Sequence, residues 1–302
     1  MRSVTIDAFA KINLTLRVLG TRSDGFHEVR TVLQTIDLSD RIVCIAQPGP
    51  FELHCKAAGV SEDPTNLVWR AADALWCAVG RPGALRDVKI VVTKRIPVRT
   101  GLGGGSSDAA AALVALTHLW QLDISHPALA HVAASLGADV PFFLWGGAAL
   151  GVGRGDEIYP LADLPRWWAL IVTPSFGIST RDAYGWSDGF DRHSEEPVVP
   201  PDPRLNGTWL GRLPILRNDL EAAVTSRHPE MARTVAALGQ QGALLAAMSG
   251  SGAAMFGLFA SDPAARAARR RLRLGRGWHA RVVRFLPRFV FERRARPRIH
   301  RR

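Results

Sequence analysis

The sequence is poor in cysteine, in lysine and in long apolar runs, and each shortage excludes a class of protein. Its three cysteines, Cys44, Cys55 and Cys77, cannot all pair and show no metal-ligand spacing. A disulfide-held fold and a cysteine metal site are therefore excluded, and a reducing cytoplasmic location is predicted. No apolar stretch approaches the ~20 residues that span a membrane, and the first residues lack the apolar core of a signal peptide. A membrane is not an expected partner.

Arginine almost replaces lysine in this chain, with 34 arginines against four lysines and a net charge of +11. Residues 263–302 hold 15 arginines and one acidic residue, Glu292, so this segment carries +14 and the rest of the chain −3. Such an end is typical of nucleic-acid or membrane-surface binding, or of a solvated helix face followed by a disordered basic tail. Because arginine is favoured throughout, we favour the second interpretation. Nucleic acid is not an expected partner.

Two common nucleotide-binding motifs are also missing, the P-loop with its lysine and the dinucleotide pattern G-x-G-x-x-G. In their place, an apolar strand over 88–93 runs into a glycine-dense loop and then into an alanine-rich helix that begins near Ser106. Glycines without a Cβ let such a loop turn its N–H groups inward, and the helix N-terminus adds more. The order predicts a phosphate site. The alternative is a flexible turn in which Ser106 is an ordinary N-cap.

The pattern of apolar residues predicts a soluble α+β protein, consistent with 302 residues, 47% hydrophobic content and a mean hydropathy of +0.04. We expect an N-terminal domain over 1–160, a second domain over 161–288 and a basic, disordered tail over 289–302. Strands are expected at 2–9, 12–19, 28–36, 41–46, 51–55, 88–94, 147–152, 167–173, 243–248, 253–259 and 278–286. Helices are expected at 66–79, 106–120, 126–136, 215–227, 229–239 and 263–274, with a long loop at 187–210.

Separate segments of the chain together resemble the GHMP small-molecule kinase superfamily. They read A-K-I-N-L-T-L at 10–16, D-G-F-H-E at 24–28, G-L-G-G-G-S-S-D-A at 101–109, L-G-A-D-V-P at 136–141 and M-S-G-S-G-A at 248–253. The resemblance covers about residues 4–285. It implies two α+β domains with the active site in the cleft between them. It also implies transfer of the ATP γ-phosphate, with Mg²⁺, to a hydroxyl of a cytidyl-diphosphate ester of methylerythritol in isoprenoid precursor synthesis. A monomer or homodimer is expected.

The resemblance assigns the chemistry to Lys11 and Asp139. Asp139 is implied to be the carboxylate that accepts the proton of the substrate hydroxyl. Lys11 is implied to lie beside it, to keep it ionised and to meet the charge that develops on the phosphoryl oxygens. Asn13 is implied to bind the substrate polyol. The alternatives are that Asp139 caps the backbone before Pro141 and that Lys11 points to solvent.

The substrate base is implied to be read by Phe26, through stacking, and by His27, through hydrogen bonds. Tyr184 is the candidate for the opposite face of the base, although it is equally typical of a half-buried helix aromatic. Thr180 is expected on the polyol or phosphate side. The loop Gly250, Ser251 and Gly252 is expected to close over the substrate, unless it is only a hairpin turn.

The ATP side is expected to contain Pro97, Gly101, Leu102, Gly103, Gly104, Gly105, Ser106 and Ser107, with Asn66 near the adenine. Arg99 stands where the family has small residues, and we expect it to point outward. Asp108 is expected to cap the helix, and no dedicated metal ligand stands out.

Two other functions stay open. One is another kinase of this superfamily, acting on mevalonate, homoserine or galactose, and the D-G-F-H segment with Tyr184 argues against it. The other is a non-catalytic descendant, and Lys11, Asp139 and the intact loop argue against that.

Overall fold

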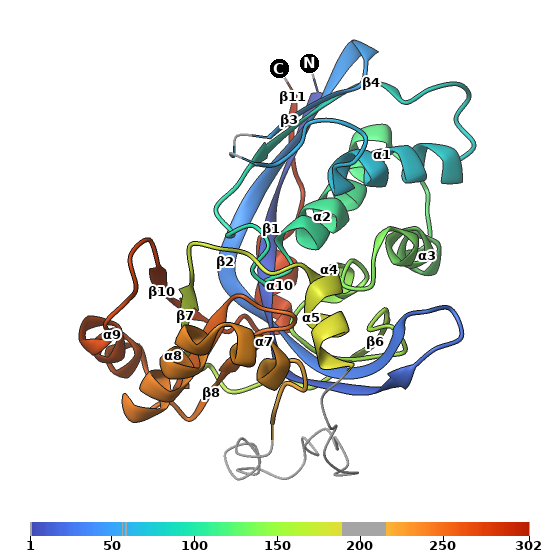
Figure 1. Ribbon diagram of the computed structural model, residues 1–302. Helices are drawn as coiled ribbons and strands as arrows, with labels where there is room; N and C mark the ends of the chain where they lie inside the picture. The colour runs from blue at the N-terminus through green and yellow to red at the C-terminus, as the bar shows by residue number, and fades with distance from the viewer. Residues whose placement is uncertain (1, 56, 58, 189–215, 302) are drawn as a thin grey trace.

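The computed structural model describes residues 2–55, 57, 59–188 and 216–301, which form two sheets with helices on their outer faces (Figure 1). The larger sheet has the order β11-β1-β2-β4-β3, and β5 and β6 extend it from β2. Its strands are β1 (Arg2–Thr21), β2 (His27–Pro50), β3 (Glu52–Cys55), β4 (Arg86–Thr93), β5 (Ala148–Val152), β6 (Glu157–Pro160) and β11 (Arg298–Arg301). Helices α1 (Leu67–Ala78), α2 (Gly104–Trp120), α3 (His126–Leu136) and α4 (Phe142–Trp145) cover one face.

The smaller sheet is antiparallel, with the order β10-β7-β9-β8. Its strands are β7 (Trp168–Thr173), β8 (Leu245–Met248), β9 (Met255–Phe259) and β10 (His279–Arg284). The helices packed on it are α5 (Thr180–Ser187), α7 (Glu221–Arg227), α8 (Pro229–Gln240) and α9 (Asp262–Arg271). The predicted α+β class is therefore confirmed. No helix in the described ranges is both long and apolar enough to cross a membrane.

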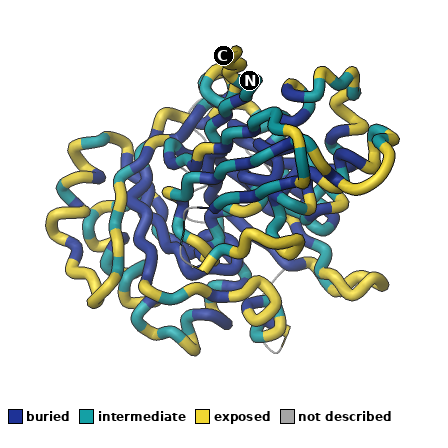
Figure 2. Tube along the Cα trace, turned by 90° about the horizontal axis from the view of Figure 1, so that it is seen from above, coloured by how far each residue is buried: buried dark blue, intermediate teal, exposed yellow. Residues whose placement is uncertain are grey.

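Three large apolar cores and one small cluster of Phe9, Leu286 and Phe291 hold the described part of the chain together, and Figure 2 shows the buried stretches concentrated in its interior. One core lies between the larger sheet and the four helices α1, α2, α3 and α4, and it contains residues such as Ile42 and Leu116. A second lies between the sheets, where Ile12 and Ile36 meet Phe256. The third joins the smaller sheet to its helices. Strand β1 runs from the first core, through Val4, Ile6 and Ala8, into the second, through Ala10, Ile12 and Leu14, and Lys11 lies where it passes from one to the other.

Helix α2 differs from its expected form at its start. It begins at Gly104, with Gly103 as its N-cap at φ 70°, so Ser106 lies in the first turn and is not the cap. Asp108 does not cap the helix either, because its side chain is buried against Lys94. Small residues over 109–112 are fully or almost fully buried, so the helix can lie close against β1. This close packing carries the glycine loop to the middle of the strand.

The predicted disorder of the C-terminal tail is wrong. Residues of α10 (Arg288–Arg294) pack on the larger sheet, and β11 pairs antiparallel with β1, matching Arg2 with Arg301. Phe291 is buried against Phe9, with ring centroids 5.9 Å apart. The prediction from the arginine count overlooked two stabilising interactions. The tail contains aromatic residues that can be buried, and β1 has an edge with which a further strand can pair.

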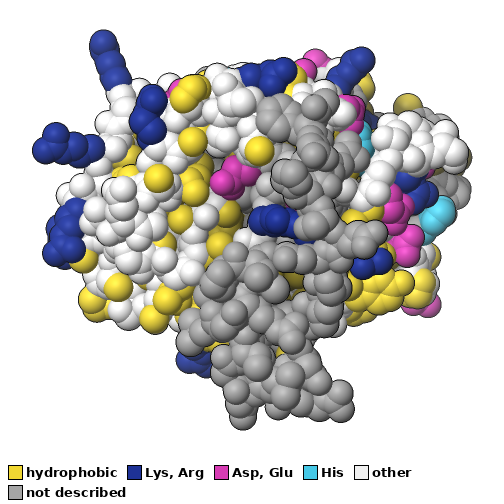
Figure 3. Space-filling view, turned by 60° about the horizontal axis from the view of Figure 1, so that its bottom comes forward, with side chains coloured by type: hydrophobic (Ala, Val, Ile, Leu, Met, Phe, Trp, Pro, Cys, Tyr) yellow, Lys and Arg dark blue, Asp and Glu magenta, His cyan; other side chains and the backbone are white. Residues whose placement is uncertain are grey.

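Several arginines of the C-terminal segment, in β10 and in the tail, pair within the chain. Arg284 and Arg294 both bind Asp37, and Arg298 binds Asp7. On the face shown in Figure 3, the Lys and Arg side chains outside the grey region lie at separate places and do not form one patch. We propose that the domain division falls near residue 160, with residues 288–301 returning to the first domain.

Most expected elements occur with shifted ends, and some were missed. The expected strands at 2–9 and 12–19 are one strand, β1, and those at 28–36 and 41–46 are one strand, β2. The expected helix over 215–227 is found only at 221–227. The expected loop at 187–210 falls largely outside the described residues. The short α4, β6 and α5 were not expected.

Candidate active site

A cleft of about 1110 Å³ opens where β1, the glycine loop, α5 and the turn at 250–251 approach one another. It brings together residues that lie far apart in the sequence, from the larger sheet and from the helix α5 and the turn that belong with the smaller sheet. From the expected set it is lined by Lys11, Asn13, Phe26, His27, Asn66, Pro97, Gly101, Leu102, Gly103, Gly104, Gly105, Ser106, Asp139, Thr180, Tyr184, Gly250 and Ser251. Ser107 and Gly252 do not line it.

Lys11 and Asp139 form an ion pair at the centre of this cleft. The distance from Lys11 Nζ to Asp139 Oδ2 is 3.3 Å. The lysine side chain is only 3% exposed, whereas that of the aspartate is 38% exposed. Lys11 Nζ also donates to Asn13 Oδ1 at 2.6 Å, and Asn13 Nδ2 donates to Thr31 Oγ1 at 2.7 Å. A buried ammonium thus stands beside a reachable carboxylate, an arrangement suited to phosphoryl transfer to a hydroxyl. The alternative of a Lys11 that points to solvent is not found.

Irregular pairing in β1 positions these side chains. The register between β1 and β2 shifts between Phe9 and Lys11 and again between Asn13 and Thr15. Bulges of this kind re-aim side chains and are common beside active sites. Here they flank Lys11 and Asn13 on both sides.

The glycine loop packs tightly against its neighbours, which explains two of its glycines. A Cβ on Gly101 would lie 2.3 Å from the carbonyl oxygen of Ser249, and one on Gly103 would lie 2.7 Å from Phe143 Cζ. Both residues have positive φ, 75° and 70°. The loop ends at the first turn of α2, whose N–H groups have no intrahelical partner and whose dipole is positive. This arrangement suits a bound anion, and the loop lies beside Lys11.

The second wall of the cleft is fixed by hydrogen bonds that the sequence did not reveal. Asn218 Nδ2 donates to the carbonyls of Met248, at 3.0 Å, and Gly250, at 2.6 Å. Ser249 is fully buried, and its hydroxyl donates to the carbonyl of Gly101 at 3.2 Å. Thr180 Oγ1 lies 3.2 Å from Ser251 Oγ. The turn joins the hairpin strands β8 and β9 and is attached to the glycine loop.

The expected base-binding residues are present but arranged differently. His27 stacks directly on Tyr184, with ring centroids 4.7 Å apart and an interplanar angle of 29°, so no base fits between these two rings. His27 Nε2 lies 2.9 Å from Asp188 Oδ1. Phe26 is 56% exposed, and the Arg154 guanidinium lies 5.3 Å from its ring centroid. Burial, and then the charge of Asp139, raise the pKa of Tyr184.

Two expected ATP-site residues, Ser107 and Asn66, and one expected substrate-binding residue, Gly252, have structural roles outside the cleft surface or at its edge. The Ser107 hydroxyl is buried and donates to the carbonyl of Phe9 at 2.6 Å, so it faces β1 and not the cleft. Asn66 is the N-cap of α1 and accepts a hydrogen bond from the Val68 amide. Gly252 lies behind the cleft, where a Cβ would be 2.9 Å from Met248 Sδ. Arg99 is exposed at the cleft edge, with φ 58°.

A buried charge cluster beside the glycine loop was missed. Lys94 Nζ donates to Asp40 and, at 2.6 Å, to Asp108 Oδ2, and all three side chains are at most 8% exposed. Burial, with Asp40 nearby, raises the pKa of Asp108 well above its usual value. The pKa of Lys94 is raised too, because its two carboxylates outweigh the effect of burial. Lys94 and Asp108 also line the cleft. The sequence signals that could have predicted this cluster are Lys94, shortly before the loop, and Asp108, directly after its serines.

Two family models match the sequence. The model of the GHMP kinases N terminal domain matches residues 66–147, and that of the GHMP kinases C terminal domain matches residues 202–275. Together they cover more than half of the chain, and they agree with the glycine loop and with the two-sheet fold. The fold and the site therefore define a GHMP kinase.

Curated relatives narrow this class. The 4-diphosphocytidyl-2-C-methyl-D-erythritol kinase of Moorella thermoacetica is 41% identical over 273 residues, which cover 88% of this chain and 93% of that protein. The kinase of the same name from Solibacter usitatus is 43% identical over 264 residues, 85% of this chain and 82% of that protein. The chain belongs to the family of 4-diphosphocytidyl-2-C-methyl-D-erythritol kinases.

Solved structures agree with this assignment. A crystal structure of 4-(cytidine 5'-diphospho)-2C-methyl-D-erythritol kinase is 34% identical, with a TM-score of 0.71 over 92% of this chain and 98% of that one. Homoserine kinase from Cytophaga hutchinsonii, at 19% identity and a TM-score of 0.67 over 99% of this chain and 97% of that one, shares the fold alone.

Proposed function

We propose that this chain transfers the γ-phosphoryl group of ATP to a hydroxyl of 4-diphosphocytidyl-2-C-methyl-D-erythritol and forms the 2-phosphate, a step toward isoprenoid precursors. The observation that carries this proposal is the Lys11–Asp139 pair, 3.3 Å apart, in one cleft with the glycine loop at the start of α2. The names of the relatives support the choice of substrate.

The ATP phosphates are proposed to bind along Gly101 to Ser106, against the first-turn N–H groups of α2. Asn66 and Pro97 line the same side of the cleft and are proposed to flank the nucleoside. Ser107 contributes indirectly, because its hydrogen bond to Phe9 ties the start of the helix to β1.

In the proposed step, a substrate hydroxyl lies at Asp139 and in line with the γ-phosphorus. A bond forms between this oxygen and the phosphorus, the bond to the β-phosphate oxygen breaks to release ADP, and the hydroxyl proton goes to Asp139. The Lys11 ammonium stabilises the charge on the transferring oxygens. Asn13, held by Lys11 and Thr31, orients the polyol.

The cytosine is proposed to stack on the exposed ring of Phe26, with polar contacts from His27, while Tyr184 supports His27 from behind. Thr180, Gly250 and Ser251 are proposed to hold the diphosphate or polyol portion. Because Tyr184 stacks on His27, its role is to position the histidine, and it does not form the opposite wall for the base.

Mg²⁺ is proposed to enter with ATP, since this ion keeps several waters and takes ligands from substrate phosphates and one or two carboxylates. No group of three His, Cys, Asp or Glu side chains in the described ranges could hold a metal by itself. The side chains fit an ion that is bound mainly through phosphate, with Asp139 as one of the exposed carboxylates that line the cleft. Mg²⁺ would neutralise phosphate charge there.

We further propose a cytoplasmic location and a monomer or homodimer. All three cysteines are free thiols, and burial raises the pKa of the Cys44 thiol, as suits an unreactive structural residue. Light scattering of the purified protein would measure its mass.

The test is an ADP-release assay with MgATP and the cytidyl substrate, with mevalonate, homoserine and galactose in parallel. Turnover with the cytidyl substrate alone is expected. Turnover with another alcohol would overturn the roles of Phe26 and His27. No turnover with any of them, in folded protein that binds ATP, would favour a ligand-binding descendant without catalysis.

A further inference from the structure

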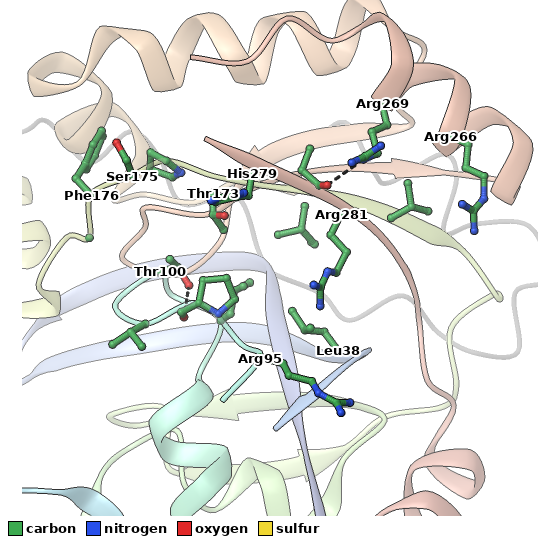
Figure 4. Close-up of a pocket in the computed structure, with 18 residues that line it drawn as sticks. Leu38, Arg95, Thr100, Thr173, Ser175, Phe176, Arg266, Arg269, His279 and Arg281 are labelled. Atoms are coloured by element: carbon green, nitrogen blue, oxygen red, sulfur yellow. Dashed lines mark hydrogen bonds between the residues drawn. The ribbon is translucent and has the colours of Figure 1, made fainter. Parts of the chain in front are cut away.

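A second cavity, of about 710 Å³, lies behind the glycine loop (Figure 4). Its walls are the edge of the smaller sheet, the helix α9 and the segment that leads into the loop. It is lined by Leu38, Arg95, Pro97, Val98, Thr100, Leu102, Ile171, Thr173, Pro174, Ser175, Phe176, Gly177, Arg266, Arg269, His279, Ala280, Arg281 and Val282. Its volume lies within the range of about 300–1,000 Å³ that is typical of small-molecule sites.

The charge of this cavity has one sign. Four arginines and His279 line it, and no aspartate or glutamate does so among the described residues. Arg266 pairs with Asp262, and Arg269 donates through Nε to the carbonyl of Ala280. For the side chains of Arg95 and Arg281, the described part of the chain provides no ion pair or hydrogen bond. A hollow lined by one sign of charge concentrates counter-ions of the opposite sign.

Arg281 is an exposed residue of β10, but it lies on the strand face that continues into the core between the two sheets. Side chains two residues apart on a strand share a face. Val283 of β10 is buried in the core between the two sheets, so Arg281 and His279 lie on this same inward face. Their cross-strand partners on β7 are Ile171 and Thr173, which also line the cavity. Arg281 is solvent-exposed, and the cavity that it lines sets it apart from the exposed arginines elsewhere in the chain.

Arginines come to the cavity from both sides. Figure 4 shows the Arg281 side chain pointing from β10 toward the wall that carries Leu38 and Arg95. Guanidinium groups bind phosphate oxygens in pairs of parallel hydrogen bonds. Between them, Leu38, Ile171 and Val282 provide apolar surface. We propose that this cavity is a binding site for an organic diphosphate, with its charged head between Arg281 and Arg95 and its apolar part over Leu38 and Ile171.

An occupant of this site would contact the back of the glycine loop. Pro97, Val98, Thr100 and Leu102 line both this cavity and the catalytic cleft. The carbonyl of Leu102 accepts the amide hydrogen bond of Lys11. A ligand here therefore acts on the loop that holds the ATP phosphates, and it changes the KM for ATP. This effect on the KM for ATP rests on the proposed kinase function, whereas diphosphate binding to the cavity does not depend on that function.

The test is calorimetric titration of the full chain with inorganic pyrophosphate, after the catalytic cleft has been saturated with a non-hydrolysable ATP analogue. We expect one further site. Arg281→Gln and Arg95→Gln should each weaken it about tenfold, the scale of one charge-assisted hydrogen bond. The matched control is Arg270→Gln, an exposed arginine on α9 that does not line the cavity and should leave binding unchanged. Two further titrations, with ADP and with pentyl diphosphate, test organic diphosphates under the same conditions.

The outcomes decide each part of the proposal. No binding with the cleft saturated, or equal losses in all three variants, would overturn the site. Tighter binding of ADP or of pentyl diphosphate than of pyrophosphate would support the apolar contact and identify the source as a nucleotide or an alkyl ester. If neither ADP nor pentyl diphosphate bound more tightly than pyrophosphate, the proposed contact of the ligand with Leu38 and Ile171 would be wrong. Binding is read without turnover, so failure of the proposed kinase activity leaves this result interpretable.

Discussion

The amide of Lys11 donates a hydrogen bond to the carbonyl of Leu102, 3.0 Å away, and this bond joins β1 to the glycine loop. The next residue of the loop, Gly103, is so close that a Cβ there would lie 3.1 Å from Lys11 Cε. The proposed catalytic ammonium and the proposed phosphate site are therefore parts of one packed unit. A change in loop geometry must alter the position of Lys11, because packed interiors do not deform continuously.

We predict that Gly103→Ala damages catalysis whereas Gly105→Ala does not. At Gly103 the new methyl would meet Phe143 and Lys11, and φ 70° is costly for alanine by about 1–2 kcal/mol. We expect kcat/KM to fall about tenfold or more. At Gly105 nothing lies within 4 Å of the position that a methyl group would take, and φ is not in the left-handed range. Steady-state kinetics of both variants measure this, and equal losses would contradict the packing argument.

We predict that Asp139→Asn lowers kcat by about 10²–10⁴-fold, because an amide cannot accept the hydroxyl proton. ATP binding should persist, since the glycine loop and the first turn of α2 are unchanged. Stopped-flow turnover combined with fluorescence titration of a nucleotide analogue separates the two effects. Wild-type turnover in this variant would remove Asp139 from the role of base.

Local sequence patterns predicted most of the fold, because β1, α1, α2 and α3 carry clear periodicity and end signals. The glycine loop was located for the same reason, since its strand, glycines and helix are consecutive. The meeting of Lys11 with Asp139 came from the family resemblance. No local pattern brings a residue of β1 to the turn between α3 and α4.

The features that the sequence did not predict depend on contacts between residues far apart in the chain. The arginines of the tail predicted a disordered end, but β11 pairs with the edge of β1 and Phe291 packs against Phe9. Ser107 was expected at phosphate because it follows the glycines, yet the helix turn directs its hydroxyl to Phe9. Asn218 could not be noticed at all, because its partners are carbonyls about thirty residues further along the chain.

We predict that Phe26→Ala raises the KM for the cytidyl substrate while the KM for ATP stays constant. Base stacking on an aromatic ring contributes about 1–3 kcal/mol, which corresponds to roughly 5- to 150-fold in affinity. The control is Tyr159→Ala, which removes a similarly exposed aromatic, 54% against 56%, that does not line the cleft. Initial rates with each substrate varied in turn give both constants. A change confined to the KM for ATP would contradict the stacking role.

We predict that Phe291→Ala destabilises the protein by about 3–5 kcal/mol, the usual cost of truncating a buried phenylalanine. The ring packs edge-on against Phe9 and directly on Gly146, where a Cβ would lie 2.1 Å from Phe291 Cδ1. Because Phe289 is 56% exposed, Phe289→Ala on the same helix should cost far less. Urea unfolding followed by circular dichroism measures both free energies. If neither variant lost stability, α10 would not be an integral part of the larger domain, and a truncation at residue 287 would then be expected to fold as well as the full chain.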